Sequence, residues 1–370
     1  MDNTKIGSKE AIALLVTIAF NHIIINMTKD IIDLTASASL LNILYIGIIA
    51  IIFTSIICYF LNKFPTFDLV DISNYLGGKF LKWVIGLLFI AYFIFFAGNL
   101  LHMFSTCLQI IYFPYTKQFY IALFFIISGI CACIMRHNAI YRSTLIIFPF
   151  IVISTLFLFL SDIQFFNIEK MYPIFGNGLY TTFFTGITNM FAFQGLAYIF
   201  FTPPLLKEPA KIKKVAITSV ILSCIFLLIC VATVLFIFNG FVDTDELLPL
   251  FSAVKYIEFG SFFQKLDSIF VLIWILSFAS YLGITIKFSS SILRKLTNFQ
   301  DDSIFIFVVG ILLFIASIWQ KNYVISTFLA NTVHKYVFFI LVIGISLLIL
   351  ISATFKKKIM RWFNKWAKIQ

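Results

Sequence analysis

The chain has 370 residues, of which 61% are hydrophobic and 12% are charged, with a mean hydropathy of +1.04 and a formal net charge of +11. Soluble domains carry about 25% charged residues, so this composition excludes a soluble globular protein. Uncharged runs such as Trp83–Gln109 and Val215–Asn239 exceed the roughly 20 residues that cross a hydrocarbon core. The sequence therefore predicts an all-α polytopic membrane protein.

Apolar runs bounded by charges or by Pro and Gly clusters predict ten transmembrane helices in one transmembrane domain over residues 1–355. Of the 27 lysines and arginines, 20 fall in the N-terminal segment, the tail and alternate connections. Because positive charge collects on the cytoplasmic side, we expect both termini in the cytoplasm. This asymmetry accounts for the basic net charge, so we expect the lipid bilayer as a partner and no binding of nucleic acid. The predicted spans are 11–27, 38–61, 83–109, 118–135, 143–161, 179–202, 215–239, 268–286, 303–319 and 336–355.

The first span carries polar residues far from either charged flank. Asn21 and His22 lie within Ala11–Met27, and no small-residue cleavage pattern follows this run, so we expect it to stay as an anchor. Lipid cannot satisfy the polar groups of Asn and His, and these side chains should face the helix bundle.

The third span has a polar stripe. Gly98, Asn99 and His102 share one face, because residues three and four apart are neighbours on a helix. They either line a small polar pocket or serve helix packing and hydrogen bonding.

The sixth span contains Gln194 and Gly195 at about mid-depth. If the ten spans form two inverted five-helix repeats, at about 11–161 and 179–355, the first and sixth helices are equivalent. In such folds both are broken near the midplane, and their freed backbone groups form the binding site. Alternatively, a lone Gln makes an interhelical hydrogen bond and a lone Gly marks close packing.

The eighth span places Ser277 and Tyr281 one helical turn apart, and in an inverted-repeat fold the third and eighth helices stand against the broken pair. The predicted site therefore has nine ligand-binding residues. They are Asn21, His22, Gly98, Asn99, His102, Gln194, Gly195, Ser277 and Tyr281.

The basic tail, residues 356–370, repeats aromatic and aliphatic residues at helical spacing, as in Ile359, Trp362 and Trp366. This pattern suits an amphipathic helix in the cytoplasmic headgroup layer, and a simple cluster of charges that stops transfer fits equally well. The connection 240–267 mixes acidic and aromatic residues, which suits a lid or a docking surface.

Several residue types are missing from the middle of the spans. The acidic residues lie in termini, connections or span ends, so we expect no carboxylate relay across the membrane. Cys131 and Cys133 lack a second pair at metal-ligand spacing. The four histidines are scattered over separate segments. We therefore expect no enzyme, no metal site and no cofactor.

Short motifs resemble one membrane-protein family. Ile6-x-x-x-Glu10 precedes the first span, and Tyr172–Gly178 approaches the sixth. Phe193–Ala197 is followed by Pro203–Pro204 and the basic segment Lys207–Lys214, and Phe263–Trp274 opens the eighth span. In this pattern the chain resembles the B subunit of bacterial spore germinant receptors, a branch of the amino acid–polyamine–organocation transporter superfamily.

Two positions depart from the pattern of that family. Its Gly-x-Gly in the first span corresponds to Asn21-His22-Ile23, and its sixth-span Glu corresponds to Ala197. The missing glycines put a wide opening for a substrate carboxylate in doubt. The missing acid weakens both a transport cycle and the binding of a cationic ligand group.

The resemblance implies a membrane subunit that binds a small germinant, such as an amino acid or a similar nutrient, and acts through partners. In the family these are an A subunit with soluble domains and a lipid-anchored C subunit. The spore inner membrane is the location it implies. The alternative is a secondary amino-acid transporter of the same fold.

Overall fold

The computed structural model describes residues 5–135, 139–238, 249–255, 266–299, 301, 303–320 and 322–366. Within these ranges the regular secondary structure is helical, apart from an isolated parallel bridge between Ile6 and Leu206. Six of the described helical stretches are long and apolar enough to cross a membrane, and Gln118–Ile134 and Ser303–Ile318 are shorter apolar helices. The predicted all-α class is confirmed.

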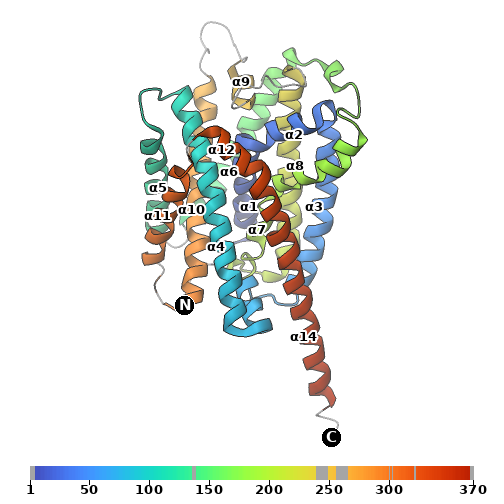
Figure 1. Cartoon of the computed structure of the whole chain (residues 1–370), viewed down its shortest axis with the longest axis vertical. Coiled ribbons are helices and arrows are strands. Elements are labelled where there is room, and N and C mark those ends of the chain that lie inside the picture. Colours follow the sequence, from blue (N-terminus) through green and yellow to red (C-terminus); the bar gives the residue numbers. More distant parts are fainter. Residues whose placement is uncertain are drawn as a thin grey trace.

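The helices of the first half are α1 (Ser8–His22), α2 (Thr28–Thr35), α3 (Ser39–Leu61), α4 (Leu69–Ile111), α5 (Gln118–Met135) and α6 (Ala139–Asp162). Those of the second half are α7 (Leu196–Ile199), α8 (Ile212–Ile237), α9 (Pro249–Lys255), α10 (Leu266–Thr297), α11 (Ser303–Ile318), α12 (Tyr323–Phe328), α13 (Lys335–Val337) and α14 (Ser346–Trp366). Both described ends of the chain, near the N-terminus and at the end of α14, lie at the same end of the bundle (Figure 1).

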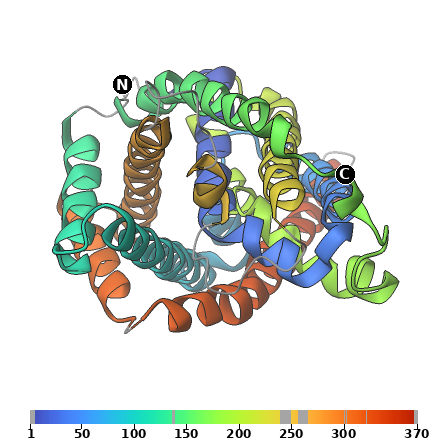
Figure 2. The ribbon, with the colours of Figure 1, turned by 90° about the horizontal axis from the view of Figure 1, so that it is seen from above.

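The first helix, α1, lies among α6, α8 and α10 (Figure 2). Its side chains from Ala13 to His22 are all buried, as expected of a helix that is apolar on every side. The Glu10 carboxylate accepts a hydrogen bond of 2.6 Å from the Gly7 N–H and so satisfies one free donor at the start of the helix. The polar pair Asn21–His22 is therefore held inside the protein and away from lipid.

The inverted-repeat hypothesis predicted that the first span is broken at Asn21 and His22. This prediction is wrong, because the helix is not unwound there. The α-geometry continues to His22, and a π-helical segment follows at Ile23–Met27 before α2 begins. The Thr28 hydroxyl donates a 2.9 Å hydrogen bond to the Ile23 carbonyl, five residues back. Figure 1 shows α2 running across the molecule at an angle to α1, so the span bends after the polar pair while it remains helical.

The sixth span departs from α-geometry over most of its length. A π-helical segment (Tyr180–Phe184) leads into a 3₁₀ segment (Thr185–Phe193), a turn follows at Gln194–Gly195, and only then does the short helix α7 begin. A 3₁₀ run of this length is unusual because its hydrogen bonds have poorer geometry. The interruption that the sequence predicts at Gln194–Gly195 is present as this turn.

The helices of other spans continue past their predicted limits through polar residues. The predicted span 268–286 is part of α10, which continues to Thr297. Helical structure of the last span begins at Tyr323, well before the predicted residue 336. The predicted span 118–135 coincides with α5.

Two regions named in the sequence analysis are described only in part. Of the connection 240–267, the described residues are α9 and the first two residues of α10, and the rest lies outside the described residues. The tail continues the line of α14 beyond the other helices as far as Trp366 (Figure 1). Its placement in the headgroup layer stays a prediction.

Candidate functional site

The amide of Asn21 joins α1 to α10. Its Nδ2 donates to the Ser277 hydroxyl at 2.9 Å and to the Thr17 carbonyl at 2.8 Å. Its Oδ1 is buried without a hydrogen-bond partner. The two predicted residues Asn21 and Ser277 are thus in direct contact, and one acceptor remains free beside them.

The turn of the sixth span lies against the same helix. A Cβ atom added to Gly195 would be 3.1 Å from the backbone oxygen of Leu15, so α1 and the turn approach closely there. Both polar atoms of the Gln194 side chain are buried without a partner. An unsatisfied buried amide costs free energy, which makes Gln194 a strong candidate for contact with a polar ligand.

His22 sits among aromatic rings contributed by other segments. Its ring centroid lies 5.1 Å from that of Phe96 on α4 and 4.6 Å from that of Phe191 in the 3₁₀ segment. Neither ring nitrogen has a hydrogen-bond partner. The ring centroid of His334 lies 5.5 Å from that of Phe96, so the histidines of the first and last spans share an aromatic neighbour.

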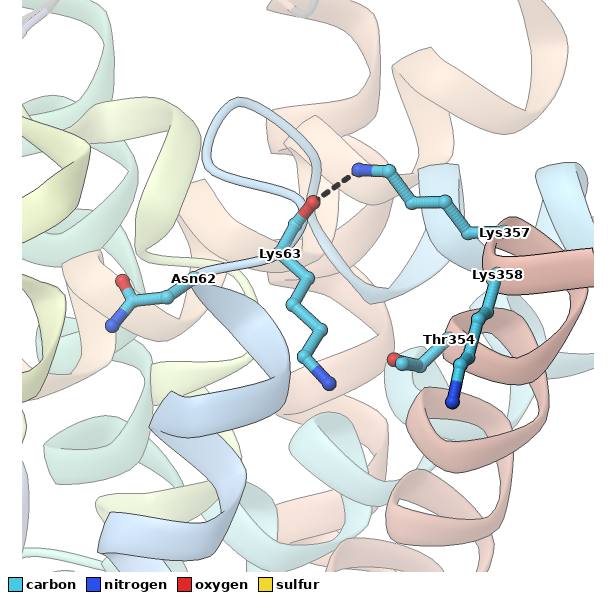
Figure 3. A pocket seen from close by; sticks show the side chains of 5 residues that line it. All are labelled: Asn62, Lys63, Thr354, Lys357 and Lys358. Atoms are coloured by element: carbon cyan, nitrogen blue, oxygen red, sulfur yellow. Dashed lines mark hydrogen bonds between the residues drawn. The ribbon is translucent and has the colours of Figure 1, made fainter. Parts of the chain in front are cut away.

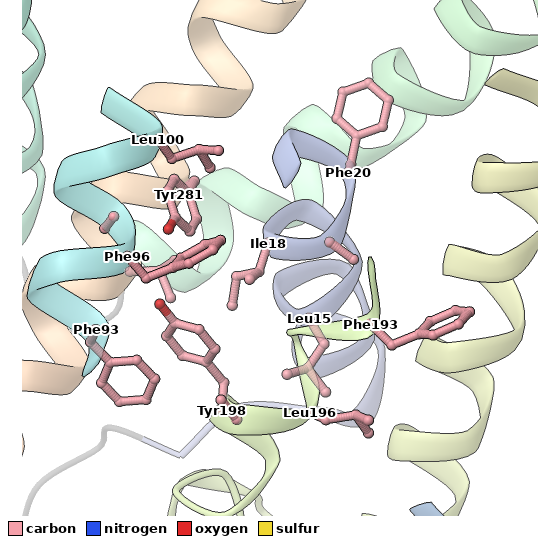
Figure 4. Close-up of a cluster of buried hydrophobic side chains, with 14 of the residues drawn as sticks. Leu15, Ile18, Phe20, Phe93, Phe96, Leu100, Phe193, Leu196, Tyr198 and Tyr281 are labelled. Carbon is pink, nitrogen blue, oxygen red and sulfur yellow. The ribbon is translucent and has the colours of Figure 1, made fainter. Parts of the chain in front are cut away.

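Two tyrosines from different helices of the second half of the chain add hydroxyl groups near this point. Tyr198 stacks on Phe93 at 4.4 Å, and its hydroxyl is 2.9 Å from that of Thr285. The Tyr281 hydroxyl is buried near the side chains of Gln194, Thr285 and Tyr198, but it forms no hydrogen bond of regular geometry. Figure 4 shows both tyrosines, which come from α7 and α10, in one cluster with Phe93 and Phe96 of α4.

The stripe on α4 faces a different neighbour. A Cβ at Gly98 would be 2.6 Å from the Ala316 side chain on α11, and His102 Nδ1 lies 2.8 Å from the Ser317 carbonyl on the same helix. The contacts of Gly98 and His102 are therefore those of helix packing. Asn99 makes a long contact of 3.9 Å to the Met103 sulfur, and its Oδ1 is buried without a partner.

A second polar group lies toward the end of the bundle opposite the termini. The Asp30 carboxylate on α2 accepts hydrogen bonds from Asn26 at 2.7 Å and from Asn331 at 2.9 Å, and it lies 3.7 Å from the Lys335 ammonium. The side chains of Asp30 and Lys335 are 5% and 10% exposed. This ion pair joins the first span to the last.

A cavity of about 450 Å³ opens beside this ion pair. Its volume falls within the range of small-molecule sites. It is lined by Asp30, Asp33, Leu34, Thr185, Thr188, Asn331, Lys335 and Tyr336. Because Thr185 and Thr188 belong to the irregular part of the sixth span, this cavity borders the first, sixth and last spans.

The group around Asp30 and Lys335 was not predicted from the sequence, because hydropathy places both residues in connections. A pattern of helical spacing was available: Asn26 and Asp30 are four residues apart, as are Asn331 and Lys335, which puts each pair on one helix face. In the described part of the chain, no group of three or more His, Cys, Asp or Glu side chains has the arrangement of a metal site.

Comparison with known proteins agrees with this architecture. The substrate-bound, outward-open state of a Na⁺-coupled sialic acid symporter matches with a TM-score of 0.62 at 11% identity, over 91% of this chain and 79% of that chain. At this identity the match shows the fold alone, and the chain has the fold of that symporter.

Two curated relatives come from Bacillus subtilis (strain 168). Spore germination protein YndE is 21% identical over 287 residues, which cover 75% of this chain and 78% of YndE. Spore germination protein B2 is 24% identical over 255 residues, which cover 66% of this chain and 67% of the relative. The family model for spore germination proteins of the permease type matches residues 5–325, and the chain therefore belongs to the spore germination protein family of membrane permeases.

Proposed function

We propose that this chain is the membrane subunit of a spore germinant receptor that binds a small germinant, an amino acid or a similar nutrient, and triggers germination through A and C subunits. The observation that carries the proposal is the group of buried polar atoms without partners beside the turn of the sixth span. These atoms belong to Asn21, His22, Gln194 and Tyr281. A small polar ligand would satisfy them.

The architecture we propose has ten spans in two inverted five-helix repeats, with both termini in the cytoplasm of the spore inner membrane. The symporter fold and the irregular first and sixth spans support this arrangement. Inverted repeats place ligand sites near the midplane, between discontinuous helices. In this orientation the cavity beside Asp30 and Lys335 opens to the outside, and we propose that a germinant enters there.

A receptor works here by a shift of conformation. A ligand that binds one arrangement of the first and sixth spans better than another moves the equilibrium toward it, by as much as its difference in affinity. The ion pair of Asp30 and Lys335 links the first and last spans and is a contact that can differ between two such arrangements. The partner subunits would respond to this change of conformation through their contacts with the chain.

A direct test measures binding and flux in the same preparation. The purified full-length chain in liposomes is exposed to the proteinogenic amino acids, one at a time, under an imposed H⁺ or Na⁺ gradient. We expect one of them to raise the thermal stability of the chain without accumulating inside. Gradient-driven accumulation or counterflow would instead establish the second candidate, a secondary amino-acid transporter, which the symporter fold favours.

Gly195 tests the location of the site. Its Cβ would be 3.1 Å from the Leu15 backbone oxygen, so Gly195→Leu should separate the turn from α1. We expect spores that carry this variant to lose the germination response while the protein remains in the membrane. Gly344→Ala is the control, because a Cβ there would be 3.5 Å from the Phe339 oxygen, an ordinary contact. A normal response of Gly195→Leu would remove the turn from the site.

A further inference from the structure

A basic cavity lies at the end of the bundle where α3 finishes and α14 passes it. Its volume is about 380 Å³, and it is lined by Asn62, Lys63, Thr354, Lys357 and Lys358. Asn62 and Lys63 follow the last turn of α3, and the other three residues share one face of α14 (Figure 3). We call it the lysine cavity.

The lysine cavity concentrates positive charge without an acidic residue among those that line it. The Lys63 ammonium lies 4.2 Å from the ring centroid of Tyr59, and the Lys357 ammonium lies 4.5 Å from that of Phe64. Cation–π contacts hold these ammonium groups in place without neutralising them. Three like charges around one cavity repel one another, and an anion in the cavity would remove that repulsion.

Thr354 supplies an independent sign of a ligand. Its hydroxyl is buried and has no hydrogen-bond partner. Such orphaned polar atoms are uncommon in proteins and call for an explanation. Figure 3 shows this hydroxyl between the ammonium groups of Lys63 and Lys358, while Lys357 reaches across to the carbonyl of Lys63. A single anionic oxygen group could therefore meet one hydroxyl and two ammonium groups at once.

The surroundings of the cavity are apolar and exposed, as at a lipid-facing surface. Tyr59 is 61% exposed, Phe355 is 62% exposed and Ile359 is 54% exposed. A free inorganic anion would make no favourable contact with these apolar side chains, whereas a phospholipid carries acyl chains next to its phosphate. Basic pockets at the cytoplasmic ends of transmembrane helices suit anionic headgroups, and the distribution of lysine and arginine predicts that this end is cytoplasmic.

We propose that the lysine cavity binds the phosphate of an anionic phospholipid of the inner leaflet. The phosphate oxygens take hydrogen bonds from the Thr354 hydroxyl and the ammonium groups of Lys63 and Lys358, with Lys357 as a further charge. The acyl chains lie along the exposed apolar side chains. The bound lipid joins the end of α3 to α14 and so ties the first half of the chain to its last helix. This inference is independent of the germinant site.

The test uses the full-length chain purified in a neutral detergent. Thermal stability is measured against increasing phosphatidylglycerol, phosphatidylcholine or inorganic phosphate. We expect phosphatidylglycerol to stabilise the wild-type chain at the lowest concentration. Lys63→Gln/Lys357→Gln/Lys358→Gln should raise the concentration needed by roughly a hundredfold, because three basic residues that attract an anionic headgroup are removed together.

A control triple variant separates the cavity from general charge. Lys9→Gln/Lys207→Gln/Lys214→Gln removes the same charge from exposed lysines and should leave the response to phosphatidylglycerol near that of the wild type. Thr354→Val keeps every charge and should weaken the response several-fold. If the lysine triple variant fails to fold, Thr354→Val still tests whether the lysine cavity binds the lipid.

The proposal is overturned if the cavity variants and the control respond alike to phosphatidylglycerol. It is also overturned if phosphatidylcholine stabilises the chain equally, or if inorganic phosphate does so at the same concentration, since the ligand would then be any lipid or a free anion. Loss of the response in both Thr354→Val and the lysine triple variant, with the control unchanged, supports it.

Discussion

At the scale of single residues, Asn42 on α3 holds the irregular part of the sixth span together. Its Nδ2 donates to the carbonyls of Thr182 at 2.7 Å and Gly186 at 3.1 Å. Its Oδ1 accepts from Asn189 at 2.9 Å. Backbone carbonyls that leave the α-helical pattern inside a membrane need partners from elsewhere in the protein, and one amide supplies two of them.

Replacement of this amide should therefore weaken the sixth span. Asn42→Leu has a similar size but leaves both carbonyls and the Asn189 amide without their partner. We expect the free energy of unfolding to fall by about 2 kcal/mol, since hydrogen bonds between membrane helices contribute less than buried bonds in water-soluble proteins. The measurement is the thermal or denaturant stability of the purified chain in detergent.

Ser55→Ala on the same helix provides the comparison. The Ser55 hydroxyl donates to the Ile51 carbonyl within α3 at 2.8 Å, so its loss should change stability by less than about 0.5 kcal/mol. Equal effects of the two substitutions would mean that Asn42 is no more than another polar residue of the helix.

Single residues also show where prediction from sequence stops. Asn21 and Gln194 stand out because they interrupt long apolar runs, and both are buried. Asn42 is the fifth residue of the predicted span 38–61, so the hydropathy pattern indicates only a polar residue near the start of that span. Asp30 and Lys335 end apolar runs, so hydropathy assigns them to connections. Their burial depends on a partner about 300 residues away in the sequence, which no local pattern reveals.

At the scale of elements, an ion-pair cluster joins the start of α4 to the end of α10. The Lys295 ammonium contacts the Asp68 carboxylate at 2.5 Å and that of Asp71 at 2.6 Å. Asp68 also caps α4 by accepting from the Asp71 N–H at 2.9 Å. Gly78, with a φ of 66°, allows the chain to kink after this first part of α4.

The substitution Lys295→Met should make the first part of α4 open more often, because it removes the ion pairs that connect it to α10. The carboxylates of Asp68 and Asp71 then lose the ammonium group that both contact, and a buried charge without its partner destabilises the folded state. We expect backbone amide hydrogens in residues 69–76 to exchange at least several-fold faster, as measured by hydrogen–deuterium exchange with mass spectrometry.

The exposed pair of Lys211 and Glu208 serves as the matched control. Their side chains are 49% and 63% exposed, with a contact of 2.8 Å, and pairs of this kind contribute little. Lys211→Met should leave exchange in residues 69–76 unchanged. If Lys295→Met also leaves it unchanged, the cluster does not hold α4 in place.

The elements themselves were predictable where a span is apolar along its whole length. Residues 118–135 coincide with α5, and α3 begins and ends within one residue of the predicted limits. The limits are wrong where a helix continues through buried polar residues. Lys287 is 6% exposed inside α10 and His334 is 7% exposed before α13, and a hydropathy scan stops at such residues although the helix does not.

At the scale of the whole molecule, the distribution of charge predicts an orientation in the membrane. Figure 1 places the loop between α4 and α5 at the end opposite the two termini. Tyr115 in that loop is fully exposed. Lys207 lies beside the N-terminal segment, because its backbone N–H donates to the Ile6 carbonyl at 2.9 Å. The positive-inside rule therefore predicts that Tyr115 faces outward and Lys207 faces the cytoplasm.

This orientation is testable with single cysteines and a maleimide that cannot cross the membrane. In a chain whose native cysteines are replaced by serine or alanine, Tyr115→Cys should be labelled in intact cells. Lys207→Cys should be labelled only after the membrane is opened. A reversed pattern would place the lysine cavity at the outer leaflet and the cavity beside Asp30 at the cytoplasmic side. The path proposed for a germinant would then begin inside the cell, where a receptor for external nutrients has nothing to detect.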